Sequence, residues 1–333
     1  MIRCTQFIVA ILLSLLAASA ADAQNLVLVA GGGTGADGAA AVDGKLDKPF
    51  CIAFDAAGNM LIGEYGGQRV RQVDPHGILT TIAGTGEKGF GGDGGPALRA
   101  LFNCPHDLVI GPDGNIYVAD SFNRRVRKID PKTGIITTFA GTGDKRATGD
   151  GGPAQSAGLD GVASLFFNPT GDLLYLTGFS KVVRVIDTKT GIIQTIPGLP
   201  GGRSLAIDSK GNLYVAGGQT LRVLGTDGKQ RLLLDKENTG GSGLPLGSNP
   251  KHLAIDPNDN VIIADEEHNM IRKYIPSEEK LVALAGTGKN GTDGIGGPPL
   301  QAELNRPHGV YVDHSGTLYI ADSMNDRVLK IGE

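Results

Sequence analysis

The chain has 333 residues, of which 52 are glycine and 17 are proline, and its formal net charge at pH 7 is −4. About a fifth of the residues therefore interrupt regular structure, which excludes a helical bundle, while 40% hydrophobic residues suffice for a folded core. Lysines and arginines form no run longer than a pair, so the chain lacks the basic patch that phosphate backbones need. These properties predict a turn-rich globular protein that binds no nucleic acid.

Residues 1–23 have the pattern of a secretory signal peptide. Arg3 precedes the apolar run 7–16, and small residues ending in Ala-Asp-Ala follow it. Cleavage after Ala23 would leave residues 24–333 as the mature chain, secreted or periplasmic. Because the apolar run is shorter than the ~20 residues that span a bilayer, we expect no membrane span once the signal is removed, uncleaved anchoring being the alternative.

One strand–turn–strand module recurs six times after this segment. In each copy an apolar strand ends near Asp or Asn, and a tight turn leads to a second β-branched or aromatic strand, which is the chemistry of a β-hairpin. The turn positions lie 40 to 57 residues apart, at Gly58, Gly114, Gly171, Gly211, Asp259 and Gly316. Four copies continue into a basic third strand, and three end in a fourth strand with Ala-Gly-Thr-Gly. Four strands at a mean pitch of about 52 residues predict the blades of a β-propeller.

The two ends of the chain predict how the ring closes. The sixth copy stops at Ile331 after its third strand, whereas residues 26–31 match the fourth strand at 79–84. We therefore expect the N-terminal strand to complete the last blade, which would remove exposed sheet edges. The predicted fold is all-β: a monomeric six-bladed β-propeller of four-stranded blades that occupies residues 24–333 as one domain.

The repeats resemble the NHL-repeat family, whose members form six-bladed propellers. The resemblance rests on Thr81–Gly86, Gly92–Ala97 and Tyr117–Ile129, which match exported bacterial members, and it covers essentially the whole mature chain. The third and fourth copies depart from the pattern, because Gly178 and Gly217 stand where the other copies have Asp or Glu. The resemblance still implies six blades, since a blade can lose loop features while it keeps its strands.

An ion pair is predicted in the loop between the second and third strands. An acidic residue recurs there with an arginine five positions further on, and a repeated structural brace explains this better than several catalytic sites. The pairs are Glu64/Arg69, Asp120/Arg125 and Asp322/Arg327. Met270 breaks the pattern in the fifth copy.

Glycine-rich segments at 91–95, 149–152 and 293–297 are interpreted as turns between blades. They lack the Lys and Ser/Thr of a phosphate loop and the alternating carboxylates of a calcium loop. The cysteines of the mature chain, Cys51 and Cys104, are expected to be buried free thiols. A disulfide between them is the alternative that an oxidising compartment would allow.

Positions at the entry to the first strand differ among the otherwise similar repeats. In a propeller these positions converge at the mouth of the central channel, where equivalent scaffolds differentiate a site. They are Phe50, His106, Ala163, Arg203, Lys251 and His308, and the next positions hold Cys51, Asp107, Ser164, Ser204, His252 and Gly309. We expect ligand binding at this mouth from Phe50, Asp107, Arg203, Lys251 and His252.

Apolar and aromatic side chains are predicted around the same rim. The loops between the second and third strands present Tyr65, Phe122, Phe179, His268 and Met324. Such tips on exposed loops favour a recognition surface for a protein, peptide or glycan. Scattered surface apolar residues are the alternative.

His106 and His308 resemble the Pro-His segments that carry the zinc ligands of peptidyl-hydroxyglycine α-amidating lyase, another propeller of this family. That resemblance implies one histidine from each of three alternate blades, with the fourth zinc position open. Here the third alternate blade offers Arg203, and His252 lies one residue out of register in the fifth. A metal, Zn or Ca, with His106 and His308 as ligands is therefore one hypothesis, and ordinary polar histidines at a channel mouth are the other.

Two functions from different classes follow. The favoured one is an exported, non-enzymatic binding scaffold that uses its loop face and channel mouth, because no Gly-x-Ser-x-Gly elbow or Cys–His pairing appears and the catalytic residues are unknown. The alternative is a metal-dependent lyase or hydrolase at the mouth, with Arg203 or Lys251 steadying an anionic substrate group. A calcium hydrolase like regucalcin or gluconolactonase is disfavoured, because the mouth positions offer one carboxylate, Asp107.

Overall fold

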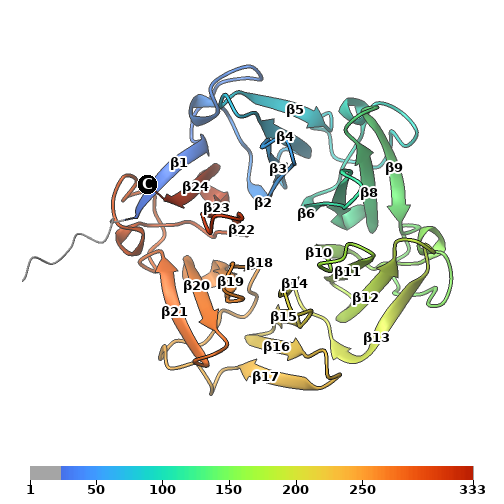
Figure 1. Cartoon of the computed structure of the whole chain (residues 1–333). Helices are drawn as coiled ribbons and strands as arrows, with labels where there is room; N and C mark the ends of the chain where they lie inside the picture. Colours follow the sequence, from blue (N-terminus) through green and yellow to red (C-terminus); the bar gives the residue numbers. More distant parts are fainter. Residues whose placement is uncertain (1–23, 333) are drawn as a thin grey trace, which may run out of the picture.

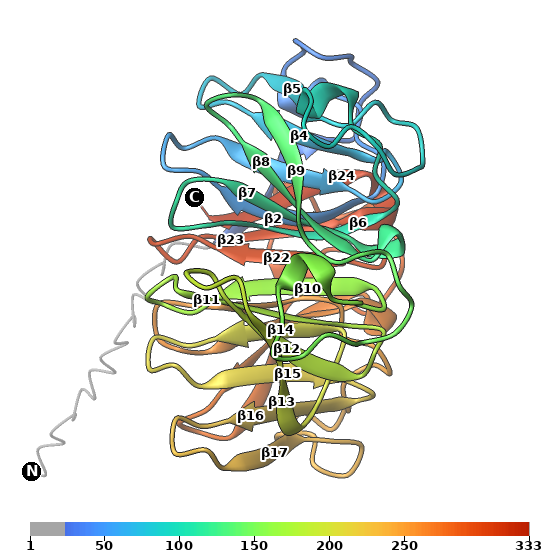
Figure 2. The same ribbon diagram turned by 90° about the vertical axis from the view of Figure 1, so that its right-hand side faces the viewer.

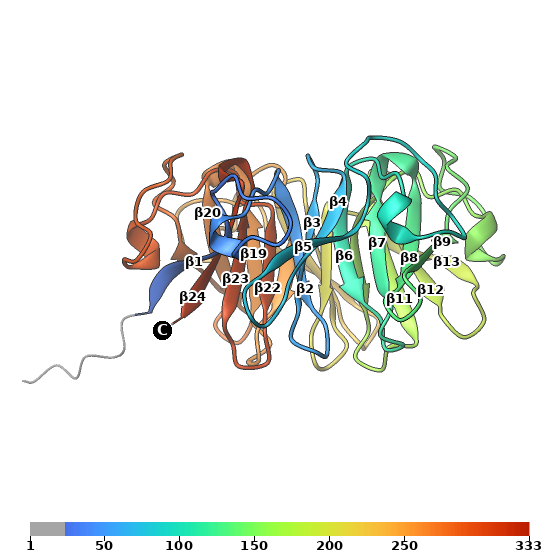
Figure 3. The ribbon, with the colours of Figure 1, turned by 90° about the horizontal axis from the view of Figure 1, so that it is seen from above.

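The computed structural model describes residues 24–332 as a ring of six four-stranded antiparallel sheets (Figure 1). Seen from the sides, the sheets form a disc whose short hairpin turns and longer loops lie on opposite faces (Figures 2 and 3). The fold predicted from the repeats, an all-β six-bladed propeller, is confirmed. In the described part, no helix is long and apolar enough to cross a membrane.

Each blade takes its strands in chain order from the channel outward, and the last blade adds β1. Blades 1 to 3 contain β2 (Pro49–Phe54), β3 (Met60–Glu64), β4 (Arg69–Val73) and β5 (Leu79–Ala83); β6 (Pro105–Ile110), β7 (Ile116–Asp120), β8 (Arg125–Asp130) and β9 (Ile135–Ala140); β10 (Val162–Phe167), β11 (Leu173–Gly178), β12 (Val182–Asp187) and β13 (Ile193–Pro200). Blades 4 to 6 contain β14 (Ser204–Ile207), β15 (Leu213–Gly217), β16 (Thr220–Leu224) and β17 (Gln230–Leu234); β18 (Leu253–Ile255), β19 (Val261–Asp265), β20 (Met270–Ile275) and β21 (Lys280–Ala285); β22 (Gly309–Val312), β23 (Leu318–Asp322), β24 (Arg327–Gly332) and β1 (Asn25–Gly31).

Helical structure in residues 24–332 is confined to single 3₁₀ turns. Four of them lie where one blade connects to the next, at η1 (Ala41–Asp43), η2 (Ala97–Arg99), η4 (Ala154–Ser156) and η6 (Pro299–Gln301). Three lie between the second and third strands of blades 2, 5 and 6, at η3 (Ser121–Asn123), η5 (Glu266–His268) and η7 (Ser323–Asn325). The corresponding loops of blades 1, 3 and 4 have no 3₁₀ turn, so the repeats differ most on the loop face.

The ring closes as the two chain ends predict. Strand β1 pairs antiparallel with β24, and Leu26 lies opposite Ile331. The outer edge of the last blade is therefore supplied by the other end of the described chain. The predicted signal segment 1–23 lies outside the described residues.

The hydrophobic core lies between neighbouring blades. One cluster joins Leu61 and Val70 of blade 1 to Leu108, Val118 and Ile136 of blade 2, all at most 2% exposed. Apolar side chains from facing sheets interlock in this way because each strand turns alternate residues to its two faces. The strands that carry the channel residues are thereby fixed from both sides.

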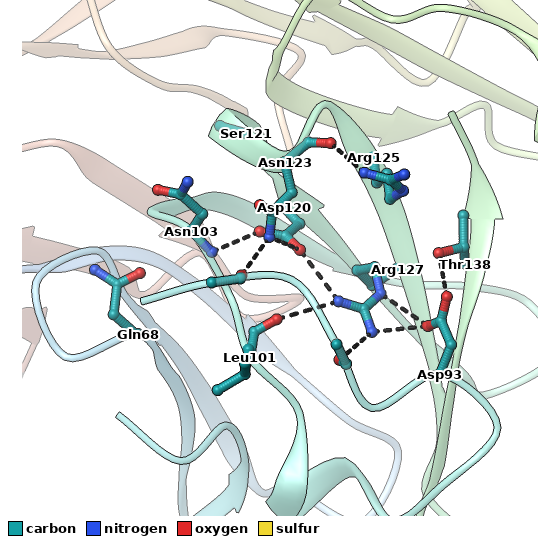
Figure 4. Close-up of polar contacts among 12 residues, drawn as sticks. Gln68, Asp93, Leu101, Asn103, Asp120, Ser121, Asn123, Arg125, Arg127 and Thr138 are labelled. Carbon is teal, nitrogen blue, oxygen red and sulfur yellow. Dashed lines mark hydrogen bonds and ion pairs between the residues drawn. The ribbon is translucent and has the colours of Figure 1, made fainter. Parts of the chain in front are cut away.

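A buried arginine holds the loops of a blade together, and it is not the arginine that the sequence pattern indicated. Arg127 is fully buried and contacts Asp120 through Nη1 (3.2 Å to Oδ2) and Asp93 through Nη2 (2.7 Å to Oδ1) (Figure 4). It also donates to the carbonyls of Leu101 and Gly91. Arg125, five positions after Asp120, donates instead to the carbonyl of Thr142. The predicted five-residue spacing is therefore wrong for this blade.

In blade 2 the arginine that pairs with the acid stands seven positions after it, and this spacing recurs in two other blades. Arg71 contacts Glu64, and Arg272 contacts Asp265. Blade 6 keeps the predicted pairing: Arg327 donates to Asp322 at 2.7 Å, because Leu329 stands seven positions after the acid. The positions five and seven residues after the acid lie on the same face of the third strand, so an arginine at either one can reach the carboxylate. Where the seventh position is arginine, that residue forms the ion pair.

The glycine-rich segments are turns, as predicted, and they have a further role. Gly92 and Gly94 adopt positive φ angles of 88° and 77°, which places Asp93 between them to accept from Arg127. Asp37 and Asp150 meet Arg71 and Arg184 in the same way. The two mature-chain cysteines are buried and free, in agreement with the expectation.

We predict that Arg127→Met lowers the free energy of unfolding by about 3–5 kcal/mol at pH 7, because it leaves the fully buried Asp120 carboxylate without its cation. Urea denaturation measures the loss. Arg125→Met is the matched control and should cost only about 1 kcal/mol, since it removes hydrogen bonds to half-exposed carbonyls. Equal losses in the two variants would contradict the assignment of the brace to Arg127.

Candidate functional site

The six positions that the internal repeats predict at the channel mouth line one small cavity. Its walls are Phe50, His106, Ala163, Arg203, Lys251 and His308. The space within it is about 10 Å³, about what one water molecule requires. A ligand could therefore insert only a small group here and would place its remaining atoms over the loop face.

Aromatic rings from four of the six blades form a continuous arc around this mouth. Phe50 stacks on His308 at a centroid distance of 3.8 Å and on Tyr65 at 4.2 Å. The His106 ring meets Phe50 and Phe122 in edge-to-face contacts, with centroid distances of 5.5 Å and 5.9 Å. The arc, defined as Phe50, Tyr65, His106, Phe122, Phe179 and His308, draws its members from blades 6, 1, 2 and 3. Such rings offer rigid apolar contact area at low entropic cost.

The two mouth histidines are neutral. Burial, together with the nearby charges of Arg203 and Lys251, lowers the pKa of His106 to about 3. Burial likewise holds the pKa of His308 well below its usual range. Each ring donates its Nδ1–H to a carbonyl two residues earlier, Cys104 or Arg306, at 2.9 Å. Both rings therefore keep Nε2 as the unprotonated nitrogen.

Arg203 brings a positive charge to the end of the arc. Its guanidinium lies over the ring of Phe179, 4.6 Å from the centroid. Its Nε is buried without a hydrogen-bond partner, and within residues 24–332 its side chain makes no ion pair. Burial lowers the pKa of Arg203, and the charges of Tyr65 and Glu266 offset this only in part. An arginine that is largely removed from water and unpaired is set to receive an anion.

Lys251 adds a second cation to the mouth. It shares the carboxylate of Glu266 with a third cation, Arg306. Lys251 Nζ lies 3.4 Å from Glu266 Oε2, and Arg306 contacts the other oxygen of the same carboxylate. Burial lowers the pKa of Lys251, with Glu266 opposing the shift. Three cations thus face one buried carboxylate, so this side of the mouth carries an excess of positive charge.

Asp107 and His252, also predicted to bind the ligand, lie outside the cavity just described. His252 Nε2 and Asp107 Oδ1 are 3.2 Å apart, although the residues come from blades 5 and 2. Burial lowers the pKa of His252, but Asp107 outweighs burial and the net pKa is raised. The pair ends an apolar channel of about 320 Å³ lined by the first strands of five blades. It closes the channel below the mouth.

The residues that directly follow the six mouth positions form a second layer of the channel. Three of them, Asp107, Ser164 and Ser204, join neighbouring blades. Asp107 Oδ2 accepts the N–H of Leu165 at 2.7 Å, and Ser204 Oγ accepts that of Leu253 at 2.7 Å. Ser164 Oγ accepts from Leu205. Each bond runs from one blade to the next, so these side chains tie blades 2 to 5 together around the channel.

The five rim residues separate into two groups. Tyr65, Phe122 and Phe179 belong to the aromatic arc, and Phe122 is 40% exposed. His268 instead places Nδ1 3.1 Å from Asp265, and the backbone of Met324 donates to Asn305 on its own side of the ring. The aromatic residues of the predicted rim therefore lie on blades 1 to 3.

The structure offers limited support for a metal between the two histidines. Within residues 24–332, no three His, Cys, Asp or Glu side chains come together in a way that could hold a metal ion. The ring of Phe50 stacks on His308 and meets His106 edge-on. A metal at the mouth would thus have His106 and His308 as protein ligands and would need further ligands from its substrate or from water.

Sequence reasoning missed the roles of Glu266 and Arg306. Glu266 occupies the loop position where blades 2 and 6 have Ser121 and Ser323, whose hydroxyls bond to backbone carbonyls of the next blade. The sequence does show that Glu266 stands where two other repeats have serine, and this difference could have marked the position. It indicates a local need for negative charge, which the cations around it explain.

The comparisons with known proteins agree with this fold. A model of the NHL repeat matches residues 102–129 and 304–331. The chain is 26% identical over 336 residues to NHL repeat-containing protein 2 of Gallus gallus, covering 84% of this chain and 46% of that protein. It is 24% identical over 290 residues to SUPPRESSOR OF QUENCHING 1, chloroplastic, of Arabidopsis thaliana, covering 86% and 25%. The chain thus spans less than half the length of these relatives.

Solved structures show the same architecture at low sequence identity. A Bacteroides thetaiotaomicron protein of unknown function has a TM-score of 0.71 at 17% identity, and an auxiliary nutrient binding protein of that organism has 0.69 at 14%; each match covers 93% of this chain and 76% of the other. An inactive virginiamycin B lyase variant from Staphylococcus aureus, with quinupristin, has 0.53 at 15%, covering 86% and 80%. At these identities the likeness concerns the fold alone. The chain thus carries segments that match the NHL repeat at residues 102–129 and 304–331, and it folds as a six-bladed β-propeller.

Proposed function

We propose that this protein is an exported binding scaffold whose channel mouth receives an anionic group of a protein or peptide ligand. The observation that carries the proposal is Arg203, a largely buried guanidinium packed on Phe179 without a carboxylate partner. A ligand carboxylate would supply the charge-assisted hydrogen bonds that this side chain lacks. Lys251 lies on the same cavity wall and would add attraction at short range.

The rest of the ligand would lie over the aromatic arc. The mouth cavity admits little more than one small group, whereas Phe122 and the other rim rings are open to the loop face. Aromatic side chains next to an arginine are the usual composition of binding hot spots. A peptide whose carboxylate adjoins an aromatic or aliphatic side chain fits both features better than an uncharged glycan does.

The metal-dependent lyase or hydrolase is kept as a second candidate on one observation. The Nδ1–H groups of His106 and His308 are bonded to backbone carbonyls, the arrangement that commonly orients a metal-ligating histidine. Metal analysis of protein purified without added Zn or Ca, compared with the His106→Ala/His308→Ala double variant, separates the candidates. The binding scaffold predicts equal, negligible metal in both; metal lost only from the double variant would favour the enzyme.

We predict that N-acetylphenylalanine binds the protein and that its carboxamide analogue binds at least about tenfold more weakly, because Arg203 selects the carboxylate. Arg203→Met should remove this preference while keeping the apolar stem over Phe179. Isothermal titration calorimetry measures both affinities. Lys132→Met, at an exposed turn, is the control for loss of one cation. Equal binding of acid and amide by the wild-type protein would overturn the proposal.

We also predict that the buried mouth histidines make the fold sensitive to acid. The pKa of His106 is about 3 in the folded protein against ~6.5 in an unfolded chain. Between these values the unfolded chain takes up a proton that the folded one refuses, so stability is full above pH ~6.5 and falls as the pH falls. His106→Gln should therefore lose about 2 kcal/mol less stability than wild type between pH 7 and 4.5 in urea denaturation.

The control for this pH experiment is His76→Gln, which removes a histidine from an exposed turn. It should follow the wild-type pH dependence. The assignment of the acid sensitivity to the mouth would be wrong if His106→Gln and His76→Gln lost stability equally on acidification.

A further inference from the structure

A second polar site lies on blade 1, apart from the channel mouth. The loop at 34–37, the segment 45–47 and the turn after β3 enclose a pocket of about 670 Å³. The charged side chains that line it are Asp37, Lys45, Asp47, Glu64, Arg69 and Arg71. None of the six mouth residues belongs to it.

The acid at the end of β3 lacks the partner that its counterparts have. In blades 2 and 6 the residue three positions after the acid caps it: Asn123 donates to Asp120 Oδ2 and Asn325 donates to Asp322 Oδ2, each at 2.8 Å. In blade 1 the acid is Glu64, only 1% exposed, and its Oε2 is buried with no hydrogen-bond partner. A buried carboxylate oxygen without a donor is costly.

The reason is a glycine at the capping position. Gly67 stands where blades 2 and 6 have asparagine, and a Cβ built on Gly67 would overlap Glu64 Oε2. The neighbouring Gly66 likewise leaves room that the carboxylate of Asp47 approaches. Two adjacent glycines thus leave the wall of the pocket beside these two acceptors without side chains, and Glu64 Oε2 without the capping amide that blades 2 and 6 supply.

The pocket offers donors as well as acceptors. Arg71 Nε is buried without a partner, although its Nη atoms bind Asp37 and Glu64. Three carboxylates and three cations line the walls, so the formal charge balances. A neutral ligand that both donates and accepts is favoured over a simple cation or anion, and vicinal hydroxyl groups have this character.

We propose that this pocket binds a neutral polyhydroxylated ligand, a saccharide, with Glu64 and Asp47 accepting hydrogen bonds from hydroxyls and Arg71 donating one. The volume accommodates a mono- or disaccharide. The site is independent of the mouth and of the peptide ligand proposed for it. Burial raises the pKa of Glu64 to about 6, with Arg71 opposing the shift, so saccharide binding should weaken as the pH falls below about 6.

The test is an NMR titration of the full chain with glucose, mannose, galactose and N-acetylglucosamine. We expect at least one of them to shift amide signals of residues 34–37 and 64–67 with a dissociation constant of about 1–10 mM, as a few hydrogen bonds allow. The double variant Glu64→Asp/Gly67→Asn should weaken this binding at least about tenfold, because it installs the acid–asparagine pair of blades 2 and 6. That pair already occurs in this fold, and an unchanged or higher melting temperature would show that the variant folds.

Arg203→Met is the matched control and should leave the saccharide titration unchanged, so failure here is distinguishable from failure at the mouth. Butylammonium and calcium chloride are titrated in parallel. Binding of either in place of the saccharides, no saccharide-induced shift at these residues, or equal binding by the folded double variant would each overturn the proposal.

Discussion

The loop face of this propeller depends on arginines buried beneath it. Arg127 bonds at once to the acid that ends the second strand, to the aspartate of the blade-connecting turn and to two backbone carbonyls. A guanidinium taken out of water is tolerated only when such partners surround it, so the two loops have little freedom to move without breaking the network. Arg71, Arg184, Arg272 and Arg327 repeat the arrangement with local changes. The loops that bear the candidate sites are therefore ordered before any ligand arrives.

Both candidate sites lie where blades depart from the repeat pattern. The second layer of the channel joins blades 2, 3, 4 and 5 in succession through Asp107 and two serines, whereas the residues of the layer above it differ from blade to blade. There, blades 6, 1, 2 and 3 contribute aromatic rings while blades 4 and 5 contribute Arg203 and Lys251. Blade 1 departs in a second way, because Gly67 leaves the buried acid Glu64 without the asparagine cap of blades 2 and 6. Both candidate sites thus contain a buried polar atom without a hydrogen-bond partner, Arg203 Nε at the mouth and Glu64 Oε2 on blade 1.

Most of the fold could be predicted from the sequence, because each blade repeats the same alternation of strand and turn. The module count and the closure by β1 are confirmed, and the six entry positions line one cavity, because register within a repeat determines position in space. The ion-pair spacing was wrong because Arg125 and Arg127 lie on the same strand face and only burial decides which one reaches Asp120. Contacts between blades, such as His252 with Asp107 or Arg306 with Glu266, join segments far apart in the chain, and no local pattern encodes them.

The central claim is that an anionic group enters the channel mouth at Arg203. A crystal structure of the protein with N-acetylphenylalanine tests it most directly. We predict the carboxylate within hydrogen-bond distance of the Arg203 guanidinium, with the phenyl ring against Phe122 and Phe179. A saturating ligand bound elsewhere, or a metal ion held by His106 and His308 in place of the carboxylate, would contradict the account.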